Sequence, residues 1–292
     1  MKRVDRLITQ DRDTSLNINT FEYHYLFPAS SSLFGGGDGA VGEEKKMLLM
    51  KNRWFAALPT SLRYAWKDNL SMIELKRGDK LPLGKEGGFV FFPINSVATL
   101  SGRSGDGPRN FIRFSGPNFL IGLADLLGSG DIRYEAEVSG TGYAFALPVT
   151  MMLNAIPRGA ARATLQVRSI SQIAEKAFFD TRCFGAHNGT QRLARVLLEA
   201  ADAFGDDRPI TLTQQELSEL LFLRRETISQ LVGEWSALNI VSLRRGSIAI
   251  QNRDGLLAQS CDCYSSIKDL ERAELATWSE IPWVIPRIPE YA

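Results

Sequence analysis

The stretch Arg224-Arg225-Glu226-Thr227 combines side chains that can read the edges of DNA bases. A guanidinium group can donate two parallel hydrogen bonds to O6 and N7 of guanine, and a carboxylate can accept one from the amino group of cytosine. Two adjacent arginines are unexpected at the start of a helix, because the helix macrodipole disfavours cations there by roughly 0.3–1 kcal/mol. We therefore expect an anionic partner outside the helix to account for this charge.

The residues around this stretch predict the order helix, turn, helix, hairpin. Thr213 and Glu216 form a T-x-x-E capping box that opens a first helix. The apolar positions of a second helix fall on one stripe: Ile228, Leu231, Val232, Trp235 and Leu238. Residues 240–251 predict two short strands around Arg244 and Arg245. This order is typical of a winged helix-turn-helix, whose second helix enters the major groove by its N-terminal end.

The candidate DNA-contacting residues lie on the polar face of the second helix and in the hairpin. They are Arg224, Arg225, Glu226, Thr227, Ser229, Gln230, Arg244 and Arg245. We expect Arg225 and Glu226 to read bases, whereas the hairpin arginines and a hydroxyl of Thr227 or Ser229 would contact phosphate, which positions a protein without specifying sequence. A solvated surface helix would explain an isolated R-R-E-T, but the order of the elements favours DNA binding.

The preceding part of the chain predicts a strand-rich domain followed by a long helix. Over 70–148, short apolar runs alternate with Gly, Pro, Asn and Asp, as in a barrel or sandwich. Over 158–204 the periodicity is helical, with a seam at spacings of three and four: Val167, Ile170, Ala174, Ala177, Thr181 and Phe184. The simplest partner for this seam is the same helix of a second chain, which predicts a homodimer. Packing on its own strand-rich domain remains the alternative.

The composition limits the classes of protein to which the chain can belong. The chain has 292 residues, a formal net charge of +1 and three cysteines. No apolar run is long enough to span a bilayer, and the N-terminus lacks the apolar core of a secretory signal. A small, odd number of cysteines suits a reducing cytosol better than a disulfide scaffold, so we expect a cytoplasmic protein without a membrane partner. No P-loop, nucleophile elbow or His-Glu-x-x-His pattern occurs, so we do not expect an enzyme.

Residues 211–256, with their core R-E-T-I-S, resemble the DNA-binding domain of the Crp/Fnr family of bacterial transcription regulators, and 256-LLAQSCDCY-264 is similar to the Cys-x-Cys-Tyr helix end of many members. The resemblance implies an α+β fold: an N-terminal antiparallel β-roll, which is a cyclic-nucleotide-binding-like jelly roll, then a long dimerisation helix and a C-terminal winged helix-turn-helix. The implied division is 1–42 as a flexible N-terminal segment, 43–157 as the sensor domain, 158–187 as the dimerisation helix, 188–265 as the DNA-binding domain and 266–292 as a C-terminal extension.

The same resemblance implies a function and partners. The protein would be a homodimer that regulates transcription by binding double-stranded DNA at a palindromic operator, with RNA polymerase as a candidate further partner. Arg225 and Glu226 match the family's G·C-reading pair, and Gln230 stands where many members have a second base-reading Arg. Phe222 occupies a turn position that is usually Gly, and Arg224 replaces the usual Ser or Thr cap. The alternative is a module of the same fold that senses an effector or binds protein without binding DNA.

The effector pocket implied by the resemblance is degenerate. Gly122 and Arg133 keep the spacing of the family's cyclic-nucleotide site, but Leu123 replaces the Glu that binds ribose and Tyr134 replaces a Ser. We therefore do not expect cyclic AMP, and the effector is unknown. A four-iron cluster would need ligands that are usually cysteines near the N-terminus, and no cysteine precedes Cys183.

The cysteines and histidines of the sequence are not sufficient to assign a metal or a cofactor. Cys183 and His187 stand four residues apart at the end of the long helix and are the candidate metal or haem ligands. Two ligands are too few to specify a site within one chain. Cys261 and Cys263 are expected on one continuous helix over 254–278, where residues two apart do not face each other.

Overall fold

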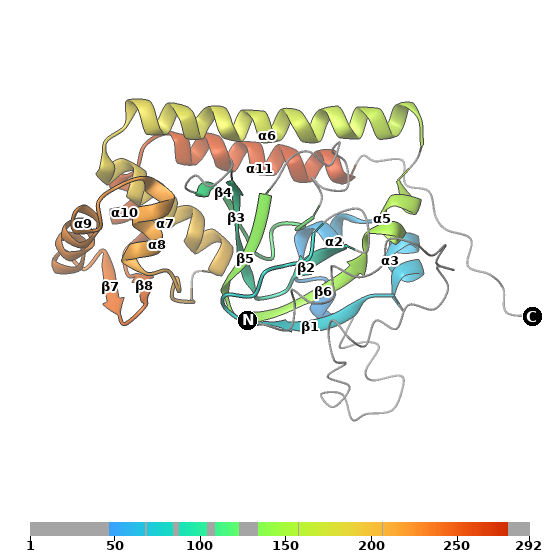
Figure 1. Cartoon of the computed structure of the whole chain (residues 1–292), viewed down its shortest axis with the longest axis horizontal. Helices are drawn as coiled ribbons and strands as arrows, with labels where there is room; N and C mark the ends of the chain where they lie inside the picture. Colours follow the sequence, from blue (N-terminus) through green and yellow to red (C-terminus); the bar gives the residue numbers. More distant parts are fainter. Residues whose placement is uncertain are drawn as a thin grey trace, which may run out of the picture. The chain divides into compact units, whose positions relative to one another are not determined.

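The computed structural model describes residues 47–67, 69–83, 88–103, 109–122, 134–156, 158–205 and 207–279. All of them belong to one compact unit, Gly36–Ala292. Within this unit a strand-rich part precedes the long helix α6 (Ala160–Ala186), and a mostly helical part follows it (Figure 1). None of the helices in the described ranges combines the length and apolar character needed to cross a membrane.

Two three-stranded antiparallel sheets form the strand-rich part. The first has the order β1 (Ser71–Leu75), β6 (Gly142–Pro148), β2 (Phe89–Pro93). The second has the order β4 (Arg109–Ser115), β3 (Val97–Arg103), β5 (Tyr134–Gly140). The prediction of short strands over 70–148 is confirmed. Non-consecutive strands pair in both sheets, as β-roll connections require, and this antiparallel roll is the predicted fold of the N-terminal part.

Three short helices flank the first sheet: α2 (Arg53–Ala57), α3 (Thr60–Trp66) and α5 (Val149–Ala155). Their apolar side chains pack with those of the sheet in one core that includes Leu62, Trp66, Phe92, Phe145 and Met152, all of which are fully buried. The chain between residues 47 and 67 therefore contributes short, separate helices to this core.

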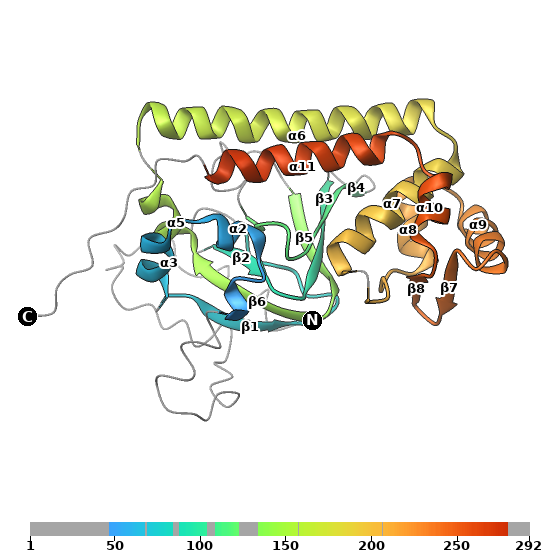
Figure 2. The same cartoon turned by 180° about the vertical axis from the view of Figure 1, so that it is seen from behind.

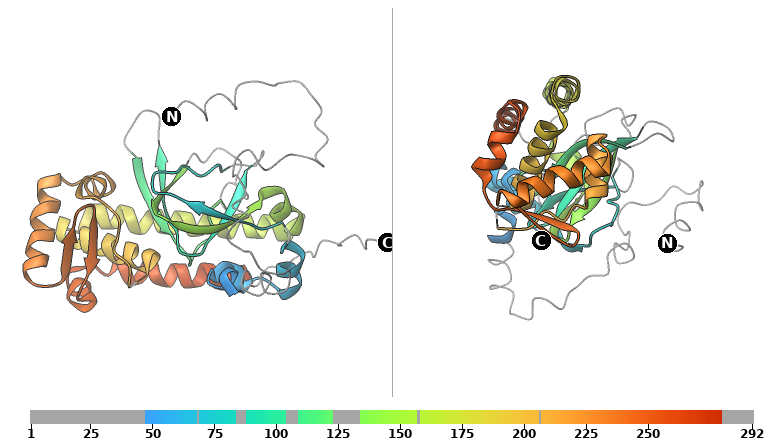
Figure 3. Two further views of the ribbon diagram at one scale, coloured as in Figure 1. Left: turned by 90° about the horizontal axis from the view of Figure 1, so that it is seen from below. Right: turned by 90° about the vertical axis from the view of Figure 1, so that its left-hand side faces the viewer.

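Helix α6 lies beside α11 (Cys263–Ser279), as the rear view and the end-on view both show (Figures 2 and 3). Its exposed residues include Val167, which keeps 63% of its accessible surface, and Phe178, which keeps 65%. Lys176, Asp180 and Cys183 are buried instead, on the side that meets α11 and the following helix. Among the described side chains of α6, Val167 and Phe178 are therefore open to solvent, whereas Lys176, Asp180 and Cys183 are enclosed.

The C-terminal part contains the predicted helix-turn-helix and hairpin. Its elements are α7 (Gly189–Phe204), α8 (Gln214–Leu221), α9 (Arg225–Ala237), β7 (Val241–Arg244), β8 (Ser247–Ile250) and α10 (Arg253–Gln259). Leu217 and Leu221 of α8 share a core with Ile228, Val232 and Trp235 of α9. Burial of these facing apolar stripes holds the two helices together across the turn.

The expected continuous helix over 254–278 is wrong. Helix α10 ends at Gln259, where Ser260 takes an extended conformation with ψ 170° and its hydroxyl donates to the carbonyl of Leu257 at 2.9 Å. A new helix, α11, begins at Cys263. The break places Cys261 between two helices, so the spacing rule for residues on one helix does not apply to the two cysteines.

A reciprocal capping box fixes the start of α8, as the sequence predicts. The hydroxyl of Thr213 accepts from the backbone N–H of Glu216 at 3.1 Å, and the Glu216 carboxylate accepts from the Thr213 N–H at 2.6 Å. Burial would raise the pKa of Glu216, but the hydrogen bonds from Thr213 and from Arg77 hold that pKa below its usual value. Arg77 precedes the roll's turn at Gly78, so the same carboxylate connects α8 to the strand-rich part.

Replacing Thr213 by Ala should lower the free energy of unfolding by about 1 kcal/mol, because the N-cap oxygen is lost. The matched control is Thr150→Ala, since Thr150 is an exposed residue within α5 whose substitution removes no cap. That change should leave stability within about 0.5 kcal/mol. Urea unfolding followed by circular dichroism measures both variants. Equal effects at the two sites would contradict the capping interpretation.

Candidate nucleic-acid interface

The turn between α8 and α9 uses a left-handed residue, as its usual glycine suggests. Phe222 has φ 51° and ψ 42°, and its N–H donates to the carbonyl of Ser218. This conformation costs a side-chain-bearing residue about 1–2 kcal/mol. The Phe222 ring packs edge-on against Phe184 of α6 with 5.9 Å between centroids, which offsets about 0.5–1.5 kcal/mol of that strain. A bulky residue is therefore tolerated because it connects the turn to α6.

Helix α9 begins without a side-chain cap. Arg224 is the N-cap residue, and its side chain makes no hydrogen bond to the first turn. The first N–H groups of a helix have no partner within the helix, and they favour an anion at that end. The departure noted in the sequence, Arg in place of Ser or Thr, therefore leaves this helix start open to an outside acceptor.

The predicted polar face of α9 is exposed. Arg224, Arg225, Glu226, Ser229 and Gln230 are open to solvent, and Thr227 is half-buried. Gln230 Nε2 donates to Glu234 Oε1 at 2.9 Å, one turn further along the helix. The apolar side of the same helix is buried, so the exposed face is fixed in orientation by the core beneath it.

The hairpin brings further arginines to the start of α9. Arg244 ends β7 and Arg245 lies in the turn, which Gly246 closes with φ 74°. A groove of about 460 Å³ is lined by both Arg225 and Arg244, together with the first residues of α8. The structure therefore brings the tip of α9 and the hairpin together on one surface, which spacing in the sequence alone could not establish.

Arg224, Arg225, Arg244 and Arg245 have no hydrogen-bond or ion-pair partner within the described ranges of the chain. Other arginines are paired: Arg77 donates to Glu216 at 2.6 Å, and Arg113 to Glu274 at 3.0 Å. Exposed, unpaired guanidinium groups near an open helix start form a surface that suits phosphates and base edges.

The sequence of this part matches a known domain family. Residues 191–259 match the sequence model of the Crp-like helix-turn-helix domain. This segment is a Crp-like helix-turn-helix domain. It contains α8, α9 and the hairpin, so the unpaired arginines all lie in the Crp-like domain. Among curated protein sequences, none matches the chain.

Solved structures extend the likeness to the strand-rich part. FixK2 from Bradyrhizobium japonicum aligns with a TM-score of 0.53 and 17% identity, over 66% of this chain and 98% of its own. A Crp/Fnr-family regulator from Thermus thermophilus aligns with a TM-score of 0.48 and 19% identity, over 65% and 98%. At this level of identity the likeness to FixK2 concerns the fold. The aligned share of this chain is larger than the Crp-like domain, so the likeness of fold extends beyond that domain.

The degenerate nucleotide pocket falls largely outside the described ranges. Leu123 and Arg133 lie there, so their predicted roles stay predictions. Gly122 has φ 98°, and a Cβ at this position would lie 2.9 Å from the carbonyl oxygen of Phe89. Tyr134 begins β5. Backbone conformation and close approach are therefore enough to require the glycine, whether or not a nucleotide binds.

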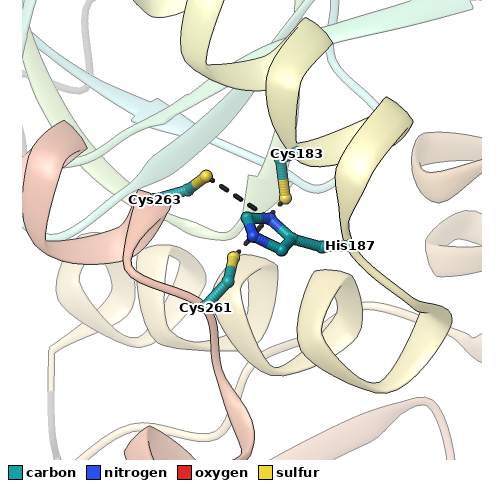
Figure 4. A group of neighbouring side chains, drawn as sticks. All are labelled: Cys183, His187, Cys261 and Cys263. Carbon is teal, nitrogen blue, oxygen red and sulfur yellow. Dashed lines mark hydrogen bonds between the residues drawn. The ribbon is translucent and has the colours of Figure 1, made fainter.

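Four side chains that flank the Crp-like domain in the chain lie close together in the structure. Cys183, His187, Cys261 and Cys263 point toward a common centre from the end of α6 and from the break between α10 and α11 (Figure 4). The hydrogen bond with Cys183 lowers the pKa of the Cys261 thiol to about 5, and the same contact raises that of Cys183. Burial raises the pKa of Cys263. Sequence reasoning missed the two C-terminal cysteines because it placed them on one helix.

Proposed function

We propose that the chain is a transcription regulator that binds a palindromic operator in double-stranded DNA as a homodimer. The observation that carries this proposal is the set of unpaired arginines around the uncapped start of α9 in a Crp-like helix-turn-helix domain. A surface that only needed solubility would have no reason to place two of them, Arg225 and Arg244, in one groove. Affinity for DNA comes mainly from phosphate contacts, and sequence preference comes from contacts to base edges.

Each exposed residue has a proposed role. Arg225 and Glu226, in the first turn of α9, read a G·C pair in the major groove. Arg244 and Arg245 contact phosphate from the wing, and Arg224, Thr227 or Ser229 bind the backbone near the open helix start. Gln230 is proposed to favour adenine at the adjacent base pair, because its amide can bond N6 and N7 of that base.

The homodimer is proposed to form through the open side of α6. Val167, Ala174, Ala177 and Thr181 of the predicted seam are exposed, and the side chain of Ile170 lies outside the described residues. Since α11 covers a different side of α6, the seam is available to a second copy. Two-fold symmetry would set the half-sites about one helical turn, ~10 bp, apart. The effector stays unassigned, cyclic AMP is not expected, and a role for RNA polymerase stays a prediction.

Selection of bound duplexes from a random pool tests the proposal directly. We expect enrichment of an inverted repeat that contains a G·C pair in each half, and loss of that enrichment in the Arg225→Ala variant. Sedimentation of the complex should give two chains for each enriched duplex. The competing function, a sensing or protein-binding module that does not bind DNA, predicts no enriched sequence at any salt concentration.

A further inference from the structure

The proposed DNA recognition does not use the cluster of Cys183, His187, Cys261 and Cys263. Their ligand atoms all lie within 4.8 Å of one another. Cys183 Sγ lies 3.6 Å from Cys261 Sγ, and Cys263 Sγ lies 3.6 Å from His187 Nδ1. Three thiols and one imidazole are a complete set of soft and borderline ligands for a tetrahedral ion.

The spacing agrees with that of a filled site. Zn²⁺ binds thiolate sulfur at about 2.3 Å and imidazole nitrogen at about 2.0–2.1 Å, so a tetrahedron has edges of about 3.7 Å between sulfurs and about 3.6 Å between sulfur and nitrogen. The two ligand pairs in the structure are each 3.6 Å apart. We propose that these four residues bind one Zn²⁺ ion.

The surroundings favour a structural ion over reactive thiols. All three cysteines are buried, and they form a small cluster of their own, apart from the two main cores. Four protein ligands leave no coordination position for a substrate, as in structural zinc sites. A multi-iron cluster attaches its ligands to separate irons and therefore needs them further apart than this group. A disulfide would require about 2.05 Å between sulfurs and would leave the third thiol and the imidazole without a role.

The outer contacts match those of a histidine bound to a metal. His187 turns Nδ1 toward the sulfurs, while its Nε2 faces Asp262 Oδ1 at 3.7 Å. Asp262 in turn accepts from Arg182 Nη2 at 2.6 Å. In metal sites a carboxylate that accepts from the second ring nitrogen orients the histidine, and Asp262 lies on that side of the ring. Asp262 stands between Cys261 and Cys263, so the same short segment supplies two ligands and the supporting carboxylate.

Positive charge near the cluster would also stabilise its zinc-bound form. Three thiolates, one neutral imidazole and Zn²⁺ carry a net charge of −1. Arg195 is fully buried and interacts electrostatically with Cys183. Its Nε and Nη2 atoms have no hydrogen-bond partner among the described residues. A metal-bound thiolate would supply a compensating negative charge next to this guanidinium group.

The ion would connect the end of α6 to the start of α11. Cys183 and His187 come from the last turn of α6, and Cys261 and Cys263 come from the segment that leads into α11. The Crp-like domain lies between these two segments in the chain. We therefore expect metal removal to loosen the junction between the Crp-like domain and the α6–α11 pair, and to lower the thermal unfolding midpoint.

The test uses the full chain, purified under reducing conditions with zinc in the growth medium. Elemental analysis should give one zinc per chain, and the chain loaded with Co²⁺ in place of zinc should show the visible absorption of a tetrahedral cobalt–thiolate site. Both measurements use the unaltered chain, so they do not depend on any variant folding. Iron in place of zinc, no metal after supplementation, or a Cys183–Cys261 disulfide found by peptide mapping would each overturn the proposal.

Matched variants locate the site. His187→Gln and Cys263→Ser should each lower zinc affinity at least about tenfold, since even supporting residues outside the ligand set typically change affinity 10–100-fold. His24→Gln removes the chain's other histidine and should keep full zinc content. A chromophoric chelator competing for zinc measures the affinities, and circular dichroism checks that each variant is folded. If a folded His187→Gln chain keeps the wild-type affinity, histidine is not a ligand and the proposed site is wrong.

Discussion

Arg225→Ala is expected to weaken binding to the selected operator by about 1–3 kcal/mol per half-site while leaving binding to scrambled DNA nearly unchanged. Arg225 lies in the first turn of α9, is exposed and has no partner among the described residues. A bidentate pair with guanine forms only at the matching base pair, so its loss relaxes preference there. Titration of both duplexes with labelled DNA over a salt series measures the two affinities.

Arg245→Ala is the matched control for this experiment. Arg245 is also an exposed, unpaired arginine, but it lies in the β7–β8 turn and is proposed to contact phosphate. Its loss should weaken binding to both duplexes alike and reduce the salt slope by about 1. If Arg225→Ala behaves in the same way, Arg225 is a phosphate contact and the proposed base reading is wrong.

Arg195→Met should lower the free energy of unfolding by roughly 3–5 kcal/mol, because it removes one member of a buried charge network. Arg195 Nη1 donates to Asp180 at 2.8 Å and to Glu199 at 2.6 Å. Lys176 Nζ also pairs with Asp180, at 2.8 Å. After the substitution, two buried carboxylates would share one cation. Chemical denaturation of both chains in the presence of a zinc chelator measures the change without a contribution from bound metal.

The control for Arg195→Met is the same substitution at Arg272. This residue pairs with Asp269 on α11, but both side chains are more than two-thirds exposed. An exposed pair contributes only about 0–1 kcal/mol, so Arg272→Met should be nearly neutral. Comparable losses of unfolding free energy at both positions would show that burial does not determine how much these ion pairs contribute to stability.

Residue types and spacing were enough to predict the Crp-like domain. The capping box at Thr213 starts a helix in the structure, as the sequence pattern predicts. The apolar stripe through Ile228, Val232 and Trp235 is buried, so the local sequence pattern and the tertiary fold favour the same helices. The left-handed turn at Phe222 could also be anticipated, because a usual glycine position implies positive φ. What the sequence could not give was the approach of Arg244 to Arg225, which depends on how the hairpin folds back.

The enclosed side of α6 escaped prediction for a physical reason. Hydrophobic periodicity identifies buried faces, but the described residues on this side are Lys176, Asp180 and Cys183, with His187 at the end of the helix. Each is polar or titratable and is accommodated by pairing or clustering, so the pattern points to the neighbouring apolar seam instead. The metal-ligand set was missed for a second reason. Its halves lie 78 residues apart at Cys183 and Cys261, and the helix break at Ser260 has no strong signal such as proline.

The chain enters the Crp-like domain after α6 and leaves it before α11 at nearly the same point, since Cys183 Sγ and Cys261 Sγ are 3.6 Å apart. A segment whose two ends meet is an insertion in topological terms, and such segments can be exchanged without rerouting the rest of the chain. Residues 188–260 can then be described as an insertion between α6 and α11. A graft would need to match the contacts of Arg77 with Glu216 and of Thr211 with Ser139. Such a graft would change the DNA-binding surface proposed above while keeping the strand-rich part unchanged.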